Sequence, residues 1–594
     1  MFYSQLRISL RTFRREKFYA SVNLLGLAMG FMCCMILGLY LYDEFTYDLH
    51  HENHDQIYRI SRLLTIEGNL SVSDTVPLDL ASMLKRDYPQ IQSYTRFSSQ
   101  LPRQTLLRYE DVNYYWDNIR IADDSVFEMF THKTVYGDKE SALVNPFSIA
   151  ISESLSKSYF GDTNPIGRSL SSEAYEYLIT YVFEDLPENS HLKYDALLSL
   201  NLVPRNPESE WLENLLTYDQ FTNSYATYIS VPRGVNSESL EQLLSDFRAR
   251  YIDGTSTLDA THIDFVAEPL PMLHYNSIAA SGPEYGNWTY VYAMSSVAVF
   301  VLFVACINYM NLAIARSLKR IEEVGMRKIL GASKGELTVQ FLIESVCFSL
   351  VALVVSLILI EFIAELIPLN HLLGKNINLS LIWTPGILSA LALSSIMLGI
   401  LTGLYPACAF SSAQPISNVK GGKSPGRSGA VARYFLVFIQ FVITISVISS
   451  SLLMYKQMEF IDNMYLGFEK RNKLLLKIQG VDSIQRIPTL ITELERHQDV
   501  LKAAAVYGEP GQIGARQTVL AQNDEGLMEP QNFKRSSIGP GYLETIGIEL
   551  LQGRDFSYDR VSDKQKAAIV NETAVRQLGW ADPIGKELQF VLAR

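Results

Sequence analysis

The sequence has little charge for its length. Asp, Glu, Lys and Arg make up 19% of its 594 residues, against about 25% in typical soluble domains. Hydrophobic residues make up 48%, which excludes an intrinsically disordered chain. The formal net charge is −12, so the whole molecule offers no electrostatic footprint for nucleic acid. The position of the apolar residues therefore carries the information.

Cysteine is also scarce, and two long stretches have none. Residues 43–284 and 456–594 lack it, so they offer neither disulfides nor thiolate metal ligands. Their lengths are sufficient for ordinary hydrophobic cores. The cysteines of the chain all lie within or beside apolar runs: Cys33, Cys34, Cys306, Cys347 and Cys408.

Several apolar runs contain no Asp, Glu, Lys or Arg at all. A helix needs about 20 apolar residues to cross a roughly 30 Å hydrocarbon layer, and only the run at 345–360 is too short. It reaches that length if the helix covers 341–367, with Glu344 and Glu361 near its ends; a buried core helix is the alternative. The sequence thus predicts membrane spans at 18–42, 285–315, 341–367, 385–405 and 434–455.

Basic residues beside the spans predict the orientation. Lys and Arg near span ends favour the cytoplasmic side, and the short loop between the third and fourth spans carries only Lys375. We therefore expect the cytoplasmic segments to be 1–17, 316–340 and 411–433, and the outside segments to be 43–284, 368–384 and 456–594. The basic residues behind this are Arg7, Arg11, Arg14, Arg15 and Lys17, then Arg316, Lys319, Arg320, Arg327, Lys328 and Lys334, then Lys420, Lys423, Arg427 and Arg433.

The outside segments are predicted to be mixed α/β. Residues 77–88 and 237–251 have the apolar spacing of amphipathic helices, and 177–183 and 262–266 alternate as strands do. The expected fold class is therefore a multi-pass α-helical membrane protein with large mixed α/β domains outside the membrane.

A short motif occurs twice in the outside segments. Ser152-Glu153 followed by Pro165-Ile166-Gly167 returns as Asn571-Glu572 followed by Pro583-Ile584-Gly585. The separations are 419 residues (571 − 152) and 418 residues (583 − 165), and the first and fifth spans are a similar distance apart. This indicates a duplicated unit. The motif itself predicts a capped helix and a turn, so it specifies fold more than a site.

Three candidate sites each have a structural alternative. Gly421-Gly422-Lys423-Ser424 resembles a phosphate loop, but that motif needs a glycine where Ser417 stands. Two glycine pairs are spaced for close helix contact, but such pairs are common in membrane spans and fit chance as well as they fit a packing role. A histidine and carboxylate cluster after the first span could hold a metal, although a structural or interfacial role is favoured. The residues are Gly26 and Gly30, Gly399 and Gly403, and His50, His51 and His54 with Asp48, Glu52 and Asp55.

The cytoplasmic stretch 308–333 is the most informative. It continues the second span as a helix in which Leu318, Ile321 and Val324 recur at three-residue steps, and Gly325 and Gly331 interrupt it. The stripe is flanked by charges of both signs. It fits either a solvated helix or a surface that docks a cytosolic partner.

At this stretch the chain resembles a known family. Glu323-Val-Gly-Met-Arg-Lys-Ile-Leu-Gly-Ala-Ser333 is similar to the segment after the second span in MacB/FtsX-type ABC transporter permeases. Residues 23–30, 43–48 with 57–59, and 185–191 resemble the Bacteroidetes-type members of that family. The resemblance covers essentially the whole chain and is not specific to a substrate.

The resemblance implies a non-catalytic permease subunit with MacB-like periplasmic core domains in the bacterial inner membrane. By the same resemblance we expect the subunit to bind no cofactor directly and ATP to bind to a separate cytosolic ABC ATPase. The subunit would then transmit mechanical work for export or efflux. The docking residues implied are Arg316, Lys319, Arg320, Glu323, Val324, Gly325, Arg327, Lys328, Gly331 and Ala332.

The family also implies an assembly. Two permease units are fused in Bacteroidetes-type members, and this sequence departs from that pattern by stopping at Arg594, within its second outside domain. We therefore expect a truncated chain, and a permease that acts as a homodimer or an intrachain pseudo-dimer. Membrane lipid surrounds the spans, and a periplasmic adaptor and an outer-membrane channel are compatible partners. A signalling role, regulating a cell-wall enzyme or a sensor kinase, is the alternative function. A membrane-bound enzyme is a third class, but the sequence shows no nucleophile elbow and no zinc-protease helix.

Overall fold

The computed structural model describes most of the chain. The described residues are 17–66, 69–98, 105–172, 175–202, 225–253, 261–277, 286–319, 326–327, 329–331, 333–368, 370, 375–411, 426–464, 466–478, 485–508, 516–560 and 562–590. They form two compact units. The first comprises residues 1–50, 187–191 and 271–459, and the second comprises 51–186, 192–270 and 460–594.

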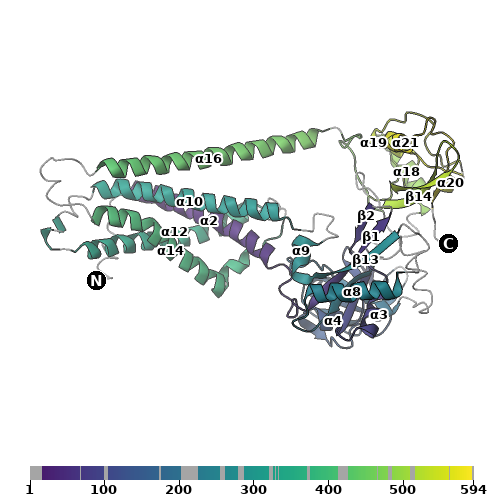
Figure 1. The fold of residues 1–594 in the computed structure, drawn as a ribbon, viewed down its shortest axis with the longest axis horizontal. Coiled ribbons are helices and arrows are strands. Elements are labelled where there is room, and N and C mark those ends of the chain that lie inside the picture. The colour runs from purple at the N-terminus through teal and green to yellow at the C-terminus, as the bar shows by residue number, and fades with distance from the viewer. Residues whose placement is uncertain are drawn as a thin grey trace. The chain divides into compact units, whose positions relative to one another are not determined.

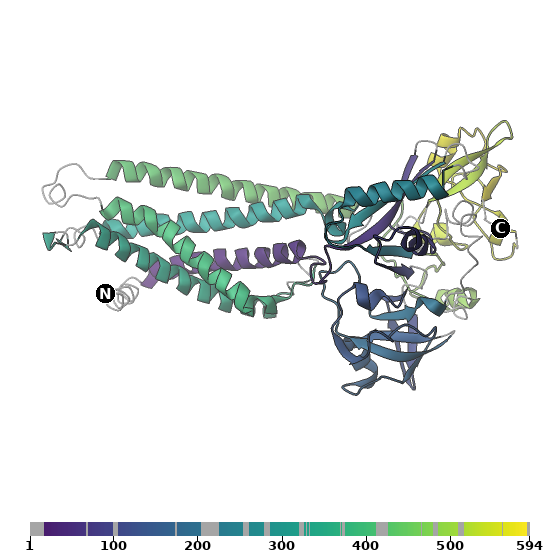
Figure 2. The same cartoon turned by 60° about the horizontal axis from the view of Figure 1, so that its bottom comes forward.

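The first unit is built from long apolar helices. Among the described residues, five helices are long and apolar enough to cross a membrane, and each overlaps a predicted span: Ser21–Phe45, Trp288–Asn311, Lys334–Leu366, Pro385–Leu404 and Tyr434–Asn463. In full, the helices are α2 (Lys17–Phe45), α10 (Trp288–Lys319), α12 (Lys334–Leu366), α14 (Pro385–Ser411) and α16 (Gly426–Asn463). In both Figure 1 and Figure 2, α2, α10, α12 and α14 run side by side.

The third span helix begins earlier than predicted. A capping box starts α12, because Ser333 accepts from the backbone N–H of Glu336 (3.2 Å) and Glu336 accepts from that of Ser333 (3.0 Å). The predicted start at residue 341 marks only where the helix becomes strongly apolar. The short η4 (Leu379–Trp383) precedes α14, which starts at Pro385, where proline needs no hydrogen-bond partner for its nitrogen.

The second unit contains a 13-stranded mixed sheet in its described part. Its main order is β13-β1-β12-β3-β6-β11-β8-β10-β9-β4-β5, with β2 beside β1 and β7 beside β10. The strands are β1 (Ile57–Ile66), β2 (Asn69–Ser73), β3 (Ser93–Ser98), β4 (Thr105–Tyr109), β5 (Val112–Trp116), β6 (Ile119–Ala122), β7 (Thr134–Gly137), β8 (Ser148–Ser152), β9 (Ser169–Ser171), β10 (Glu176–Phe183), β11 (Ala196–Ser199), β12 (Tyr225–Ser230) and β13 (Thr261–Pro269).

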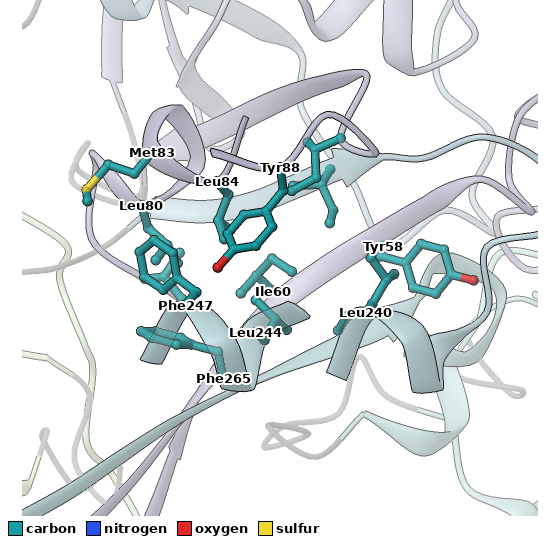
Figure 3. Close-up of a cluster of buried hydrophobic side chains, with 14 of the residues drawn as sticks. Tyr58, Ile60, Leu80, Met83, Leu84, Tyr88, Leu240, Leu244, Phe247 and Phe265 are labelled. Carbon is teal, nitrogen blue, oxygen red and sulfur yellow. The ribbon is translucent and has the colours of Figure 1, made fainter. Parts of the chain in front are cut away.

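Two helices bury apolar faces against one end of this sheet. They are α3 (Leu80–Asp87) and α8 (Ser237–Tyr251), and their side chains pack with those of β1 and β13 in one core. Figure 3 shows Leu84, Leu244 and Phe247 converging there. The predicted helix over 237–251 and the predicted strands are confirmed, whereas the helix predicted from residue 77 begins only at Leu80.

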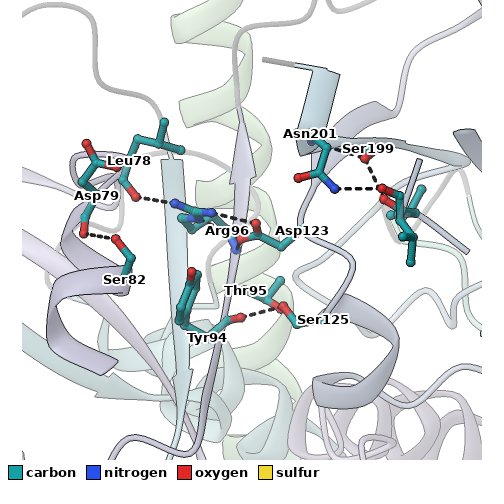
Figure 4. A network of polar contacts seen from close by, with 12 residues as sticks. Leu78, Asp79, Ser82, Tyr94, Thr95, Arg96, Asp123, Ser125, Ser199 and Asn201 are labelled. Atoms are coloured by element: carbon teal, nitrogen blue, oxygen red, sulfur yellow. Dashed lines mark hydrogen bonds and ion pairs between the residues drawn. The ribbon is translucent and has the colours of Figure 1, made fainter. Parts of the chain in front are cut away.

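A second core lies at the other end of the same sheet. The helix α5 (Glu153–Phe160) packs Leu155 and Phe160 against strands that include β8 and β10. Between the two cores, the buried Arg96 of β3 donates to Asp123 (2.7 and 2.8 Å) and to the carbonyl of Leu78 (2.6 Å), as Figure 4 shows. A buried charge is tolerable only when it is paired in this way. The remaining short elements here are α4 (Val126–Met129), η1 (Leu200–Leu202), η3 (Leu270–Met272) and α9 (Leu273–Asn276).

The repeated motif has the same local structure in both places. Ser152 caps α5 and Asn571 caps α21 (Glu572–Leu578), each accepting from the backbone N–H three residues on. In the following turn, Asn164 and Asp582 each accept from the N–H two residues on (both 3.0 Å). Gly167 and Gly585 then both take positive φ angles, of 84° and 85°. The motif therefore specifies the same capped helix and turn twice.

The second copy of the motif belongs to a small sheet. Its strands are β14 (Arg516–Gln522), β15 (Met528–Lys534) and β16 (Leu588–Phe590), in the order β15-β14-β16. The indole of Trp580 is buried and donates to the carbonyl of Gln522 (2.7 Å). The helices nearby in sequence are α18 (Ile487–Glu495), α19 (Tyr542–Ile546) and α20 (Asp563–Lys566).

Candidate functional site

The predicted docking segment is described in part. Arg316 and Lys319 lie in the last turns of α10, which ends at Lys319. Arg327 and Gly331 are described, and Gly331 has a φ of +100°, a conformation that favours glycine. The other predicted docking residues lie outside the described residues: Arg320, Glu323, Val324, Gly325, Lys328 and Ala332.

The described part of this segment exposes three apolar side chains. Met326, Ile329 and Leu330 are 59%, 65% and 82% exposed, and their spacing puts them on one face of a helical turn. Arg327 between them is half-buried and donates to Gln340 Oε1 (2.9 Å), which ties the turn to α12. We call Met326, Ile329 and Leu330 the elbow patch. The sequence interpretation favoured Leu318, Ile321 and Val324 and overlooked this patch, although the i, i+3, i+4 spacing of Met326, Ile329 and Leu330 is also visible in the sequence.

The four predicted packing glycines all face a neighbouring helix. A Cβ on Gly26 would lie 3.2 Å from Asn308 Nδ2, and one on Gly30 would lie 2.6 Å from the Cβ of Ala305, both on α10. On α14, a Cβ on Gly399 would lie 2.7 Å from the Cα of Val346, and one on Gly403 would lie 2.6 Å from Ser345 Oγ. At the distances below 3 Å, those of Gly30, Gly399 and Gly403, a larger side chain would force the helices or their side chains to shift, whereas at Gly26 a small shift of Asn308 would suffice.

A cluster of charged and polar groups joins three distant segments of the first unit. Glu44, in the last turn of α2, accepts from His274 Nε2 (2.8 Å), Tyr275 OH (2.7 Å) and Lys375 Nζ (2.9 Å). Lys375 also pairs with Asp43 Oδ2 (2.5 Å). The side chains of Glu44 and His274 are only 8% and 6% exposed. We call Asp43, Glu44, His274, Tyr275 and Lys375 the junction cluster.

The surroundings of Lys375 and Tyr275 in the junction cluster raise the pKa of both side chains, so both stay protonated. Burial alone would lower the pKa of Lys375, but its hydrogen bonds and charge interactions with Asp43 and Glu44 outweigh burial and raise it. Burial and the hydrogen bond to Glu44 both raise the pKa of Tyr275. Lys375 is therefore a cation and Tyr275 a hydrogen-bond donor throughout the physiological pH range.

Residues just beyond α2 are tied to the segment 187–191. Asp48, which is buried and has a φ of +61°, accepts from the N–H of His191 (2.9 Å) and pairs with its ring Nδ1 (2.9 Å). Tyr47 donates to the carbonyl of Ser190 (3.1 Å), and its ring stacks on His274 with centroids 3.7 Å apart. The two stretches that carried part of the family resemblance, 43–48 and 185–191, thus meet in space.

The histidines after the first span make contacts within the protein. The ring Nδ1 of His51 accepts from the backbone N–H of Thr131 (3.1 Å), and His54 Nδ1 lies 2.8 Å from the carbonyl of His51. In the part of the chain that the structure describes, no group of three or more His, Cys, Asp or Glu side chains is arranged to hold a metal. Residues 421–424, the incomplete phosphate-loop motif, lie outside the described residues.

Two family models match the chain. The MacB-like periplasmic core domain matches residues 20–247, and the FtsX-like permease C-terminal domain matches residues 295–415. The first match covers α2 and much of the large sheet, and the second covers α10, α12 and α14.

Relatives and solved structures are similar to parts of the chain. The macrolide export ATP-binding/permease protein MacB of Agrobacterium fabrum is 32% identical over 21% of this chain and 18% of its own length. That of Burkholderia cenocepacia is 23% identical over 58% of this chain and 46% of its own length. A Porphyromonas gingivalis domain from a protein described as a permease is 24% identical, with a TM-score of 0.33, over 39% of this chain and 95% of that domain.

The two family models define the class of protein, an ABC transporter permease that combines long apolar helices with a MacB-like periplasmic core domain. The chain belongs to the MacB/FtsX-type family of these permeases. It spans less than half the length of the MacB relatives named above.

Proposed function

We propose that this chain is the non-catalytic permease subunit of an ABC transporter, and that it transmits the work of a separate cytosolic ATPase to its periplasmic domains for export or efflux. Family membership supports the class. The elbow patch supports the partner, because three exposed apolar side chains beside a fixed arginine suit a protein interface better than water. ATP would bind to the partner.

The proposal includes an orientation in the inner membrane. The N-terminus and the elbow patch are cytoplasmic, and the large sheet is periplasmic. The support is the distribution of lysine and arginine along the chain, because basic residues concentrate in the segments 1–17, 316–340 and 411–433. A cytosolic ATPase could bind the elbow patch only if the patch lies on the cytoplasmic side.

Co-purification with the ATPase tests the docking role. We expect the double variant Ile329→Ser with Leu330→Ser to weaken binding at least about tenfold, since interface hot spots each cost about 2 kcal/mol or more.

Charge reversal of Arg327 and Lys328, or Gly325→Pro, should uncouple ATP hydrolysis from function while membrane insertion persists. Leu178→Ser, at an exposed position of the sheet, is the matched control. Unchanged co-purification after all three changes would contradict the docking role.

A further inference from the structure

The junction cluster connects two segments that are far apart in the sequence: the connection between α12 and α14, and the segment between the large sheet and α10. Lys375 lies in the connection between α12, which ends at Leu366, and α14, which starts at Pro385. His274 and Tyr275 belong to α9, which lies between β13, the last strand of the large sheet, and α10. Glu44 holds both, so a single carboxylate bridges the α12–α14 connection and the segment that leaves the sheet.

Lys375 is held within the α12–α14 connection, and that connection is packed on the helices. Its backbone N–H donates to the carbonyl of Asn370 (3.2 Å), and the N–H of Ile377 donates to the side chain of the same asparagine (3.1 Å). Ile377 packs in a buried cluster with Leu39 of α2 and Ile360 of α12. Movement of the α12–α14 pair must therefore carry the Lys375 ammonium with it.

The segment from the sheet is held just as closely on the other side. The backbone N–H of Gly286 donates to the carbonyl of His274 (2.7 Å), and a Cβ on Gly286 would lie 2.6 Å from the His274 ring. Tyr275 stacks on Trp288, the first residue of α10, with centroids 4.4 Å apart. The polar heads of His274 and Tyr275 then both point at Glu44.

We propose that Glu44 is a positioning residue that passes displacement of the α12–α14 pair to the segment connecting the sheet with α10. The inference rests on the proposed function and names the place where the work crosses from the membrane helices to the periplasmic domain. The physical reason is that the carboxylate cannot leave its partners cheaply. Separation of Lys375 from α2 would take one of three donors from the buried Glu44 carboxylate and both carboxylates from the Lys375 ammonium, and separation of α9 would take the other two donors of Glu44, so the joined segments move together.

Tyrosine rings strengthen the same bridge without being charged. The Lys375 ammonium lies 5.4 Å from the ring centroid of Tyr40 and 5.7 Å from that of Tyr47, distances at which a cation is attracted to the ring face. Tyr47 is the residue that also stacks on His274. Lys375 and His274 therefore both contact the Tyr47 ring as well as the Glu44 carboxylate.

Hydrogen exchange in the assembled complex tests the inference. The full chain is reconstituted in lipid nanodiscs with the ATPase that co-purifies with it, and amide exchange over residues 270–276 is compared without nucleotide and after vanadate trapping. We expect the wild-type exchange rate to change at least about fivefold between the two states, the low end of typical coupling between sites. Glu44→Gln and Lys375→Met should each remove most of that change, whereas Lys375→Arg should retain it.

Glu361→Gln is the matched control. Glu361 is also a carboxylate near the end of a span helix, and it accepts from Trp383 Nε1 (2.7 Å), but that bond joins only α12 to η4 in the same hairpin. The control should keep the wild-type response. Binding of the ATPase and exchange in β10 should be unaffected in every variant, which separates loss of coupling from loss of fold.

The outcomes separate the two proposals. A wild-type response that survives in Glu44→Gln and Lys375→Met overturns the role of Glu44 and leaves the permease function standing. An equal loss in Glu361→Gln also overturns it, because the loss would then not be specific to the junction cluster. A wild type that does not respond to nucleotide overturns the proposed transmission itself, and the role of Glu44 with it.

Discussion

Several buried charged side chains in the described part of this protein occur in matched sets. Arg96 has Asp123, and Arg59 has Glu268 (3.2 Å) on the strands β1 and β13. The Glu44 carboxylate has three donors. Since an unpaired buried charge costs several kcal/mol, these residues are constrained as pairs and not singly. Replacing one member alone is therefore the damaging change.

The partly buried side chain of His50 predicts that the stability of the folded chain depends on pH. Burial lowers the pKa of His50 below its usual 6.5, and the charge of Asp48 opposes this only in part. The unfolded chain then binds a proton that the folded chain does not. The stability contributed by neutral His50 is complete above pH 6.5 and is lost as the pH falls towards the lowered pKa.

The measurement is the thermal midpoint of the full chain in nanodiscs. We expect it to fall between pH about 7.5 and about 5.5, and to fall less in His50→Asn. His497→Asn, at an exposed histidine, is the control and should follow the wild type. An identical fall in His50→Asn and the wild type would contradict the assignment.

Between helices, contact depends on which face a small residue occupies. Gly30 and Gly38 lie on the same helix, α2, yet a Cβ on Gly30 would meet Ala305 whereas one on Gly38 would meet nothing within 4 Å. Ser349 adds a polar contact between α12 and α14 through the Oγ of Ser395 (2.9 Å). In lipid, such close approach and hydrogen bonding hold helices together, because burial of apolar side chains contributes little there.

The two glycines of α2 provide a matched test. We expect Gly30→Val to destabilise the helix bundle by about 1–3 kcal/mol, the usual cost of overpacking, and Gly38→Val to have little effect. The measurement is the denaturant or thermal unfolding of the detergent-solubilised protein. Equal losses in both variants would mean that helix propensity, and not contact with α10, sets the cost.

For the whole molecule, the order of spans and outside segments determines which parts an ATPase can reach. The predicted orientation alternates five times along the chain, so a single inverted span would reverse everything after it. The elbow patch and the large sheet must lie on opposite sides of the membrane for the proposed function to hold.

Cysteine labelling in intact cells tests that arrangement. Tyr115→Cys, on β5, and Leu330→Cys, in the elbow patch, are both at exposed positions, with side chains 56% and 82% exposed. A membrane-impermeant maleimide that passes the outer membrane should label Tyr115→Cys in intact cells, and should label Leu330→Cys only after the inner membrane is opened. Leu330→Cys labelled in intact cells would contradict a cytoplasmic elbow patch. The wild type, whose cysteines lie within or beside spans, gives the background.

Local features were readable from the sequence because they depend on neighbours along the chain. Charge-free runs predict spans, the helix period of 237–251 predicts α8, and Ser152 and Asn571 predict helix caps. The family of the chain was also readable, since its motifs are contiguous. The two glycine pairs were readable only as spacing, because the sequence does not say which residue faces each glycine.

Tertiary structure alone decided the junction cluster. Glu44 lies 230 residues from His274 and 331 from Lys375, and no period or motif that we found in the sequence relates these three positions. Adjacent acids at a span end, or one lysine in a short loop, are ordinary features of a membrane protein. They become a shared buried bridge only when packing brings the three segments together, since the strength of each bond comes from its partners and from the exclusion of water around them.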